Sequence, residues 1–503
     1  MTSLPYTPSS LYFGGQPQQP ISRTTFKTID PSTNSPLAVL TESSQSDIDR
    51  AISSAAEAFP KWAATPAAER ARILQKAALI IRERNDELAR VETHDTGKPF
   101  SETSTVDVVT GADVLEYFAN LVGSGGLNGE TSVLREDAWV YTKKEPLGVC
   151  VGIGAWNYPI QIALWKSAPC LTAGNTMIYK PSEVTPLHGQ YLAEIYTQAG
   201  VPPGVFNIVQ GGPSVGTYLT THPTVAKVSF TGQVSTGKKV AGCAAGSMKY
   251  VTMELGGKSP LLVLDDADVE TAVEGAMMAN FFSTGQVCTN GTRVLIQKAM
   301  KPEFEELLLE KLQNVRVGSL MNPNTNFGPL VSETHYQKVR GYIKHGIEVD
   351  KAKLLYGGLE APEFPSGTDE KLKQGFWVRP TIFTNCRDDM RIVKEEIFGP
   401  VMCILTYDTL EEAIRRANDT ELGLAAGVFT KDLNKAHRMV AKLEAGITWI
   451  NGWGESPAEM SVGGWKMSGV GVENGKRGIE AWVRNKSTLI DMSGKIATAF
   501  PKL

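Results

Sequence analysis

The stretch Gly148-Val149-Cys150-Val151-Gly152-Ile153-Gly154 is a short apolar run that ends at a glycine turn, and a helical segment follows it. Similar runs and helical segments alternate as far as residue 255. This alternation predicts an α/β fold, a parallel sheet with helices on both of its faces. The predicted strands are residues 148–154, 176–179, 205–209, 227–230 and 250–255. The predicted helices between them are residues 160–173, 187–199, 214–220 and 235–245.

A second alternating series runs from residue 260 to about residue 450, so the sequence predicts two doubly wound α/β domains. Its strand candidates are residues 293–297, 401–405, 427–430 and 446–450. Upstream, helical periodicity covers residues 47–94, with Pro66 near the start of the second helix, and another helix is expected at residues 106–121. Residues 356–375 read as an inserted loop.

Composition limits the partners of the chain. Its 503 residues exceed what a single core holds, and 42% of them are hydrophobic and 21% charged. The formal net charge of −4 favours neither nucleic acid nor an anionic membrane. No apolar run is long enough to span a bilayer, and residues 1–20 lack a signal-peptide pattern and are expected to form a mostly irregular arm.

The cysteines and histidines argue against a disulfide-bonded protein of an oxidising compartment and against a zinc-dependent enzyme. The six cysteines are scattered without a CxxC pair, which fits a reducing compartment such as the cytoplasm. The six histidines form no zinc-binding pattern, so no metal is expected. The last three residues, Pro501-Lys502-Leu503, differ at one position from the Ser-Lys-Leu peroxisomal address, which leaves a peroxisomal location open.

The covalent chemistry is expected at Cys288, which follows a Gly-Gln pair in residues 281–293. A lone cysteine is often only a small buried hydrophobe. Glu254, at the end of a strand-like run, changes that reading, because a cysteine and a carboxylate base form a recognisable pair for covalent catalysis. Asn157, at the end of another strand, is a candidate amide donor to an oxyanion, and a buried capping asparagine is the alternative.

Two glycine turns are candidates for a phosphate site. Residues 228–237 read as strand, turn and helix start, but Gly232 and Gly237 do not make the GxGxxG fingerprint. The turn at Gly152 and Gly154 lacks its third glycine. Either turn could be an ordinary connection, and the segment 180–183, which could bind ribose hydroxyls, could be a surface loop.

Two further patterns concern the substrate and assembly. Tyr158 and Trp165 lie seven residues apart on one face of the predicted helix, where their rings could attract a quaternary ammonium group or simply pack in the core. Residues 139–144 and 487–492 read as edge strands, and pairing between subunits would cover them.

Ordered motifs along nearly the whole chain resemble those of the aldehyde dehydrogenase superfamily. They are WNYP, KPSE, FTG followed by TGK, MELGGKSP, GQVCTNGTR, EEIFGP and GGWKMSG. Longer stretches resemble the branch that oxidises trimethylaminobutyraldehyde and betaine aldehyde. These are EPLGVCVGIGAWNYPIQIALWKSAP, ANFFSTGQVCTNGTRV, TNCRDDM and VKEEIFGPVM.

The resemblance implies two Rossmann-like domains, a small β arm for oligomerisation, and assembly into a homodimer or homotetramer. The NAD-binding domain would comprise residues 1–129 and 148–256, the catalytic domain 257–455, and the oligomerisation segments 130–147 and 478–503. Cys288 would be the nucleophile, Glu254 the general base, and Asn157 with the Cys288 backbone N–H the oxyanion site. The implied cofactor-binding residues are Ile153, Gly154, Trp156, Lys180, Ser182, Glu183, Gly212, Gly216, Phe230, Thr231, Gly232, Gln233, Thr236, Gly237, Leu255, Glu396 and Phe398.

Glu183 near the ribose predicts NAD rather than NADP, because a carboxylate repels a 2′-phosphate. The expected reaction is oxidation of 4-trimethylaminobutyraldehyde to 4-trimethylammoniobutanoate; betaine aldehyde and ω-aminoaldehydes are the alternatives. A CoA-acylating enzyme and a non-catalytic relative are further, less favoured alternatives. The implied substrate-binding residues are Tyr158, Trp165, Trp453 and Glu459. Two positions depart from many relatives: Gln233 replaces a small residue near the phosphates, and Val462 replaces an aromatic one.

Overall fold

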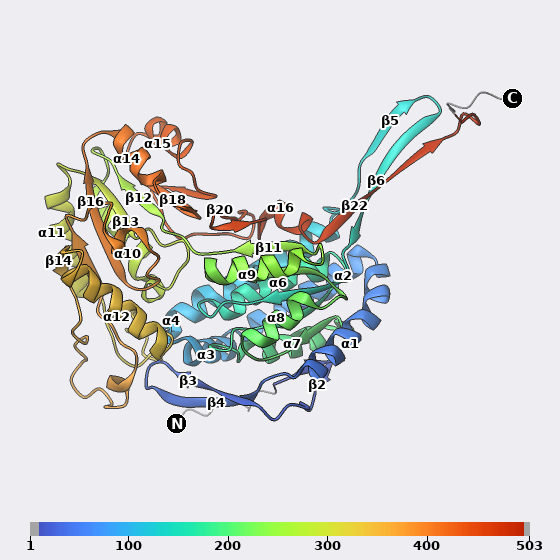
Figure 1. Ribbon diagram of the computed structural model, residues 1–503, viewed down its shortest axis with the longest axis horizontal. Coiled ribbons are helices and arrows are strands. Elements are labelled where there is room, and N and C mark those ends of the chain that lie inside the picture. Colours follow the sequence, from blue (N-terminus) through green and yellow to red (C-terminus); the bar gives the residue numbers. More distant parts are fainter. Residues whose placement is uncertain (1–9, 497–503) are drawn as a thin grey trace.

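The computed structural model describes residues 10–496, and at its centre is an eight-stranded sheet in the order β2-β1-β9-β8-β7-β10-β11-β21 (Figure 1). Its five central strands are parallel and mostly buried. They confirm the five strands predicted before residue 256. Their bounds are β7 (Val149–Ile153), β8 (Thr176–Lys180), β9 (Phe206–Ile208), β10 (Val225–Thr231) and β11 (Tyr250–Glu254).

Alternation along β7 explains why helices cover both faces of this sheet. Val149, Val151 and Ile153 pack in one core with helices α1, α8 and α9, whereas Cys150 packs in the other with α2, α3, α5, α6 and α7. Successive strand residues point to opposite faces, so a strand covered on both faces must be apolar at every position. The helices are α1 (Gln45–Ala64), α2 (Ala67–Glu83), α3 (Asn85–Thr96), α5 (Val108–Gly123), α6 (Pro159–Thr172), α7 (His188–Ala199), α8 (Pro213–Thr221) and α9 (Val234–Ala245).

A seven-stranded sheet forms the second domain, in the order β14-β15-β16-β13-β12-β18-β19. All its pairs are parallel except β14 with β15, and the four predicted strands of this region are confirmed. The strands are β12 (Pro260–Val263), β13 (Arg293–Gln297), β14 (Lys353–Tyr356), β15 (Thr381–Thr384), β16 (Val401–Tyr407), β18 (Ala425–Phe429) and β19 (Ile447–Ile450). The helices are α10 (Val269–Phe281), α11 (Lys301–Lys311), α12 (Glu333–Glu348), α13 (Arg391–Lys394), α14 (Leu410–Asn418) and α15 (Leu433–Val440).

After the second sheet the chain returns to the first. β20 (Trp465–Lys466) pairs with β17 (Leu422–Gly423), and β21 (Gly469–Val470) pairs antiparallel with β11. The short helix α16 (Gly475–Glu480) then leads into the last strand. This late segment therefore joins the two sheets directly beside the end of β11.

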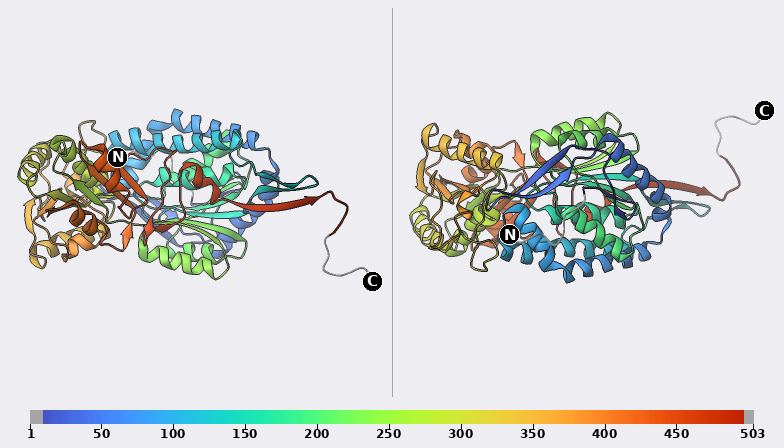
Figure 2. Two further views of the ribbon diagram at one scale, coloured as in Figure 1. Left: turned by 90° about the horizontal axis from the view of Figure 1, so that it is seen from above. Right: turned by 90° about the horizontal axis from the view of Figure 1, so that it is seen from below.

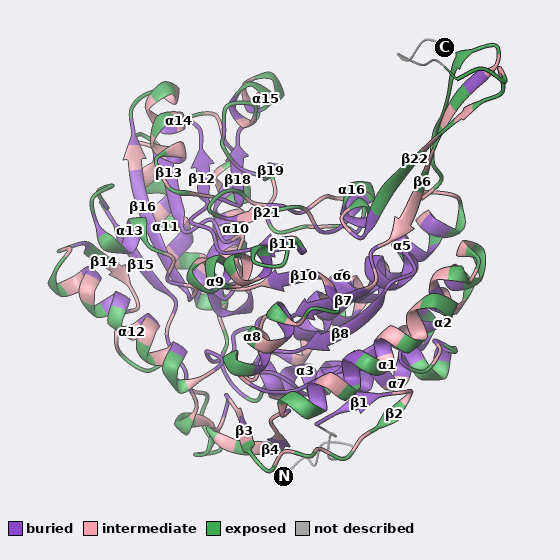
Figure 3. Cartoon of the chain, turned by 45° about the vertical axis from the view of Figure 1, so that its right-hand side comes forward, coloured by how far each residue is buried: buried purple, intermediate pink, exposed green. Residues whose placement is uncertain are grey.

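A three-stranded antiparallel sheet projects from the body as an arm (Figures 1 and 2). It consists of β5 (Thr131–Arg135), β6 (Ala138–Pro146) and β22 (Val483–Asp491). The prediction that residues 139–144 form an edge strand is wrong, because β6 is central and pairs with β22 on one side and with β5 on the other. β22 is an edge, as predicted, and much of its surface is exposed (Figure 3).

The amino-terminal segment is more ordered than the sequence indicates. β1 (Tyr12–Phe13) and β2 (Gln16–Pro17) extend the edge of the first sheet, and Tyr12 pairs with Ile208. β3 (Thr25–Asp30) and β4 (Ser35–Thr41) form a separate hairpin. β1 and β2 have two residues each, too few to show a strand pattern, and the other partner of β1, β9, is distant in sequence. Residues 1–9 and the tripeptide Pro501-Lys502-Leu503 lie outside the described residues.

Candidate active site

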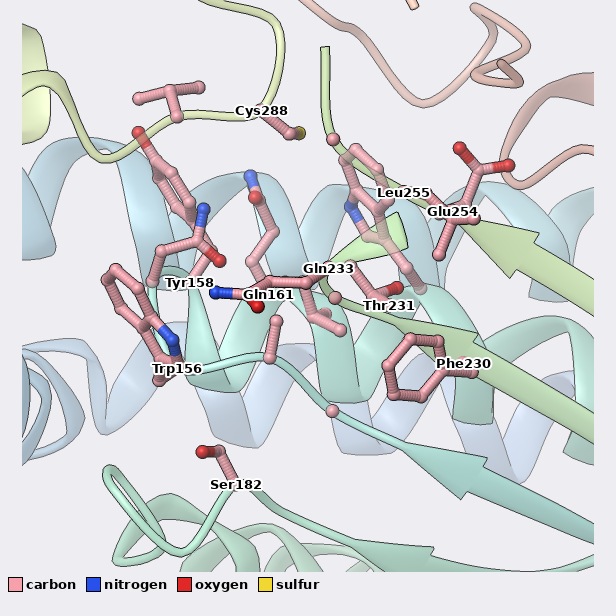
Figure 4. A pocket seen from close by; sticks show the side chains of 18 of the residues that line it. Trp156, Tyr158, Gln161, Ser182, Phe230, Thr231, Gln233, Glu254, Leu255 and Cys288 are labelled. Carbon is pink, nitrogen blue, oxygen red and sulfur yellow. The ribbon is translucent and has the colours of Figure 1, made fainter. Parts of the chain in front are cut away.

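A cavity of about 950 Å³ lies where the two large sheets face each other. Ile153, Lys180, Thr231 and Glu254 are the last residues of β7, β8, β10 and β11, and all four line it. The carboxyl ends of parallel strands are the usual ligand-binding edge of such a sheet. Loops of the second domain bring Cys288 to the same cavity. Figure 4 shows Cys288 and Glu254 at one end of the labelled side chains and Ser182 at the other.

The structure brings almost all the predicted site residues together around this cavity. Besides the strand-end residues and Cys288, the lining includes Gly154, Trp156, Asn157, Tyr158, Trp165, Ser182, Glu183, Gly212, Gly216, Phe230, Gly232, Gln233, Thr236, Leu255, Glu396, Phe398 and Trp453. Two predicted residues lie elsewhere. Gly237 faces Leu255 inside α9, where an added Cβ would lie 2.4 Å from the leucine side chain. Glu459 is exposed and lies near Tyr117, whose pKa is raised first by burial and then by the charge of Glu459.

An unusual backbone segment precedes the candidate nucleophile. Ser283 and Thr284 have φ values of 50° and 54°, and Gly285 follows with 71°. A left-handed conformation costs roughly 1–3 kcal/mol for a residue other than glycine and persists only where its surroundings hold it. An added Cβ on Gly285 would lie 2.3 Å from the backbone of Gly399, so only glycine fits there.

The Cys288 thiol is protonated at neutral pH in the free protein. Burial, followed by the charges of Glu396 and Glu254, raises its pKa to about 12. The thiol must therefore lose its proton before it can attack a substrate. Gly257 lies close to the same loop, since its Cβ would be 2.7 Å from the Cys288 carbonyl oxygen.

Asn157 lies between β7 and α6 and is anchored to the cysteine loop. Its Nδ2 donates to the Gln286 carbonyl oxygen at 2.9 Å, and the residue is buried. The side chain of Gln286 is held in turn, because its Oε1 accepts from the Val331 N–H at 3.0 Å. An amide nitrogen carries two N–H groups, so Asn157 keeps one donor for a ligand beside Cys288.

Glu254 ends β11 as a buried carboxyl group whose Oε1 has no hydrogen-bond partner among residues 10–496. Burial, and then the charge of Glu473, raise its pKa well above the usual value, whereas the Lys166 ammonium opposes the shift. Glu473 Oε1 accepts from Lys166 Nζ at 2.7 Å and from Ser229 Oγ at 2.9 Å. No sequence pattern indicates Lys166 or Glu473, and Glu473 lies 219 residues after Glu254.

The far end of the cavity combines a charged pair with two helix starts. Lys180 Nζ lies 3.3 Å from Glu183 Oε2, and both residues line the cavity. α8 begins after Gly212 and α9 after Gln233, and neither start has a side-chain cap. Uncapped helix starts offer free N–H groups and the positive end of the helix dipole to an anion.

Glu396 and Phe398 also line the cavity. Glu396 Oε1 accepts from the Gly257 N–H at 3.0 Å. Phe398 has a left-handed φ of 63°, and its carbonyl oxygen contacts His335 Nε2 at 2.6 Å. The rings of Trp156 and Phe398 are 5.1 Å apart, and those of Trp156 and His335 4.9 Å. No sequence pattern indicates His335, because its contacts with Phe398 and Trp156 join segments that are distant in the sequence.

Aromatic side chains surround the cavity on the side of the cysteine. Tyr158, Trp165, Phe282 and Trp453 all line it. The indole N–H groups of Trp165 and Trp453 have no partner in the part of the chain that the structure describes. Phe282 was not predicted, although it lies within the quoted cysteine stretch. Val462 also lines the cavity.

The described residues contain no cluster of three or more histidine, cysteine or acidic side chains that could hold a metal ion. Among residues 10–496, no helix combines the length and apolar character needed to cross a membrane.

A family model described as the aldehyde dehydrogenase family matches residues 18–488, and the chain belongs to this family. Similar solved structures include betaine aldehyde dehydrogenase from Staphylococcus aureus in complex with NAD+. It is 36% identical, with a TM-score of 0.93, and the match covers 99% of this chain and 98% of that one. An indole-3-acetaldehyde dehydrogenase in complex with NAD+ is also 36% identical, with a TM-score of 0.92 and 97% of each chain covered.

A mutant of aldehyde dehydrogenase from Bacillus cereus is 37% identical, with a TM-score of 0.92. That match covers 97% of this chain and 98% of the other. These similarities establish the aldehyde dehydrogenase fold, with two large sheets and small antiparallel ones. They include relatives named for quite different aldehydes, so the family is shown and the substrate is not.

Proposed function

We propose that this protein oxidises an aldehyde to a carboxylic acid with NAD, and that its substrate is 4-trimethylaminobutyraldehyde. The product would be 4-trimethylammoniobutanoate. The observation that carries the proposal is the meeting of Cys288, Glu254 and Asn157 at one cavity, although three distant segments supply them. Betaine aldehyde and ω-aminoaldehydes are the alternatives within the same chemistry.

Each of the three residues has a distinct role in this reaction. The Cys288 thiolate attacks the aldehyde carbon, and the resulting oxyanion accepts hydrogen bonds from the Asn157 amide and the Cys288 backbone N–H. Loss of one such donor typically lowers the rate about 100- to 1000-fold. After oxidation, a thioester remains on Cys288. The Glu254 carboxylate then takes a proton from water, which attacks the thioester and releases the acid.

The residues at the strand ends fit a dinucleotide. Lys180 and Glu183 would bind the adenosine ribose, the uncapped start of α9 the pyrophosphate, and Glu396 the second ribose. When bound, NAD supplies a hydride acceptor. Gln233 lies at the start of α9 without capping it, so its side chain does not occupy the N–H groups that an anion would use.

The aromatic side chains near Cys288 support a cationic substrate. Tyr158, Trp165 and Trp453 present ring faces or edges to the cavity, and such rings attract quaternary ammonium groups. Asp113, which is paired with Arg82 Nη2 at 2.7 Å, and Glu455 are acidic residues of the lining. Because Glu459 lies outside the cavity, these two acids replace it in the proposal.

The function is tested with two variants and a set of aldehydes. Cys288→Ala should abolish oxidation. Glu254→Gln should retain an initial burst of reduced cofactor but lose steady-state turnover, because only hydrolysis needs the base. Catalytic efficiency should be highest with 4-trimethylaminobutyraldehyde, compared with betaine aldehyde and 3-aminopropanal. An undiminished steady-state rate in Glu254→Gln refutes the proposed base, and CoA-dependent product formation would favour a CoA-acylating enzyme.

Cofactor choice is tested at Glu183. Its carboxylate accepts hydrogen bonds from a ribose diol and repels a 2′-phosphate, so catalytic efficiency should be at least tenfold higher with NAD than with NADP. Glu183→Gln should narrow that ratio by improving use of NADP. A wild-type preference for NADP contradicts the assignment.

We further propose that the enzyme is a cytoplasmic homodimer or homotetramer. Six free thiols support a reducing compartment. The exposed arm supports assembly, because Val133 on β5 and Leu489 on β22 are 75% and 58% exposed. The proposed domains remain residues 1–129 with 148–256 for NAD, 257–455 for catalysis, and 130–147 with 478–503 for assembly.

A further inference from the structure

The left-handed backbone at Ser283 and Thr284 is held by contacts from outside its own segment. Thr284 Oγ1 donates to the Gly328 carbonyl oxygen at 3.0 Å. Ser283 Oγ contacts the Tyr158 hydroxyl at 2.6 Å and donates to the carboxylate of Glu102. Ser283 and Thr284 are each only 3% exposed, so water does not replace these partners.

The hydrogen bonds around Ser283 have a defined direction. Glu102 is a buried carboxyl group that accepts the Ser283 hydroxyl hydrogen. Burial and the charge of Glu102 raise the pKa of Tyr158 well above its usual value, so the phenol keeps its proton and donates to Ser283. The chain of donors therefore runs from Tyr158 to Ser283 to Glu102. Tyr158 lines the cavity beside Cys288 (Figure 4).

Glu102 is fixed by charged groups that lie outside the cavity. It ends the short helix α4 (Phe100–Glu102), and a π-helical turn (Thr103–Asp107) follows it. Lys98 Nζ lies 3.7 Å from Glu102 and 2.7 Å from Asp107. The same ammonium group lies 3.2 Å from the centroid of the Tyr158 ring. Lys98 thus holds both the acceptor and the donor that flank Ser283.

We infer that Glu102 is a positioning residue for the nucleophile, acting through Ser283 to hold the strained segment that sets the direction of Cys288. The inference rests on the proposed role of Cys288. Glu102 is not among the residues that line the cavity. Without the hydrogen bond from Ser283 to Glu102, the segment can relax to an ordinary backbone conformation and displace the Cys288 thiol. The affected step is therefore the attack of the sulfur on the aldehyde.

A merely structural role would give a different result. In that case, loss of Glu102 or Ser283 would lower stability without changing the chemical rate of the molecules that remain folded. Asp95 provides a matched control, since it is another buried carboxylate, 1% exposed, whose Oδ2 accepts a single backbone hydrogen bond, from Leu187 at 2.9 Å.

The test compares Ser283→Ala, Glu102→Leu, Glu102→Gln and Asp95→Asn in the full-length enzyme. The readouts are the single-turnover rate of reduced-cofactor formation per titrated active site, the KM for NAD and the melting temperature. Ser283→Ala and Glu102→Leu should lose at least tenfold in single-turnover rate with less than a threefold change in KM. Glu102→Gln, which keeps an acceptor, should remain within threefold of wild type. Asp95→Asn should keep the wild-type rate even if it melts earlier.

A wild-type single-turnover rate in Ser283→Ala overturns the inference, and this variant decides the matter if Glu102→Leu does not fold. An equal loss in Asp95→Asn overturns it as well, because the effect would then be general to buried carboxylates. Cys288→Ala separates the two proposals. Activity in Cys288→Ala would contradict the proposed function itself. If Cys288→Ala is inactive and Ser283→Ala is fully active, only the proposed role of Glu102 is refuted.

Discussion

At the scale of single residues, burial sets the chemistry of this site. It is the largest cause of the raised pKa values of both Cys288 and Glu254, and the charge of Glu254 adds to the shift at Cys288. A raised pKa gives a stronger base and nucleophile once the proton is lost, but fewer molecules have lost it at neutral pH. In the free enzyme, burial therefore favours the protonated form of both groups.

This predicts how activity depends on pH. Both groups act in their deprotonated forms, and the pKa of each is raised, so deprotonation becomes more favourable as the pH increases. The efficiency kcat/KM should rise continuously from pH 6 to pH 9. Steady-state kinetics at constant ionic strength check this, with melting temperatures measured at each pH as a control. A plateau that begins below pH 6 would contradict the raised pKa values.

Some of these residues could be found from sequence and others could not. Cys288, Glu254 and Asn157 follow strand-like or glycine-marked stretches, so local patterns point to them. Lys166 and Glu473 carry no such mark. They become relevant only because folding brings them to Ser229 and to the buried end of β11.

At the scale of elements, the glycines after β11 allow the two domains to meet. An added Cβ on Gly256 would lie 2.1 Å from Glu396 Oε2, and the neighbouring Gly257 donates its N–H to the same carboxylate. The stretch that follows Glu254 is therefore glycine-rich because of contact with the second domain. Its conformation alone does not require glycine, since neither residue has a positive φ.

Gly256→Ala should displace the Glu396 carboxylate and raise the KM for NAD at least tenfold, with a smaller effect on the aldehyde KM. Initial-rate kinetics with each substrate varied in turn measure this. Gly242→Ala in α9 is the control, because nothing lies within 4 Å of its added Cβ. It should leave both KM values unchanged. An unaltered KM for NAD in Gly256→Ala would remove Glu396 from the proposed cofactor site.

Strands were predicted correctly where helices cover both of their faces, and they were missed where they are short. The apolar runs of the two parallel cores are local signals, and they identified strands such as β7 and β16. β1, β5 and β21 are short, so their sequences carry little pattern. β1 and β5 pair with the neighbouring strands β2 and β6, whereas β21 pairs with the distant β11. Because β5 was not recognised as its second partner, β6 was mistaken for an edge strand.

At the scale of the whole molecule, the two large sheets and the arm have separate roles. The carboxyl ends of one sheet and the loops of the other enclose the cavity, while the arm extends away from both (Figure 1). Exposed apolar side chains on an edge strand favour association. The arm is thus the part of the described chain best suited to pair with another copy.

Replacing Val133 and Leu489 together with aspartate should therefore break the assembly into smaller species. Charges on an apolar contact weaken it, and the two strands stand at opposite edges of the arm. Light scattering coupled to size-exclusion chromatography gives the mass. Far-ultraviolet circular dichroism confirms that the subunits remain folded. An unchanged mass in the double variant would exclude the arm as the assembly surface.

The central claim is that an acyl group is transiently bonded to Cys288, and trapping it is the most direct measurement. Glu254→Gln is mixed with 4-trimethylaminobutyraldehyde and NAD, quenched in acid within the burst, digested and examined by mass spectrometry. We predict a 4-trimethylammoniobutanoyl group on the peptide that contains Cys288 and on no other cysteine peptide. Formation of reduced cofactor with an unmodified Cys288 peptide would contradict the account.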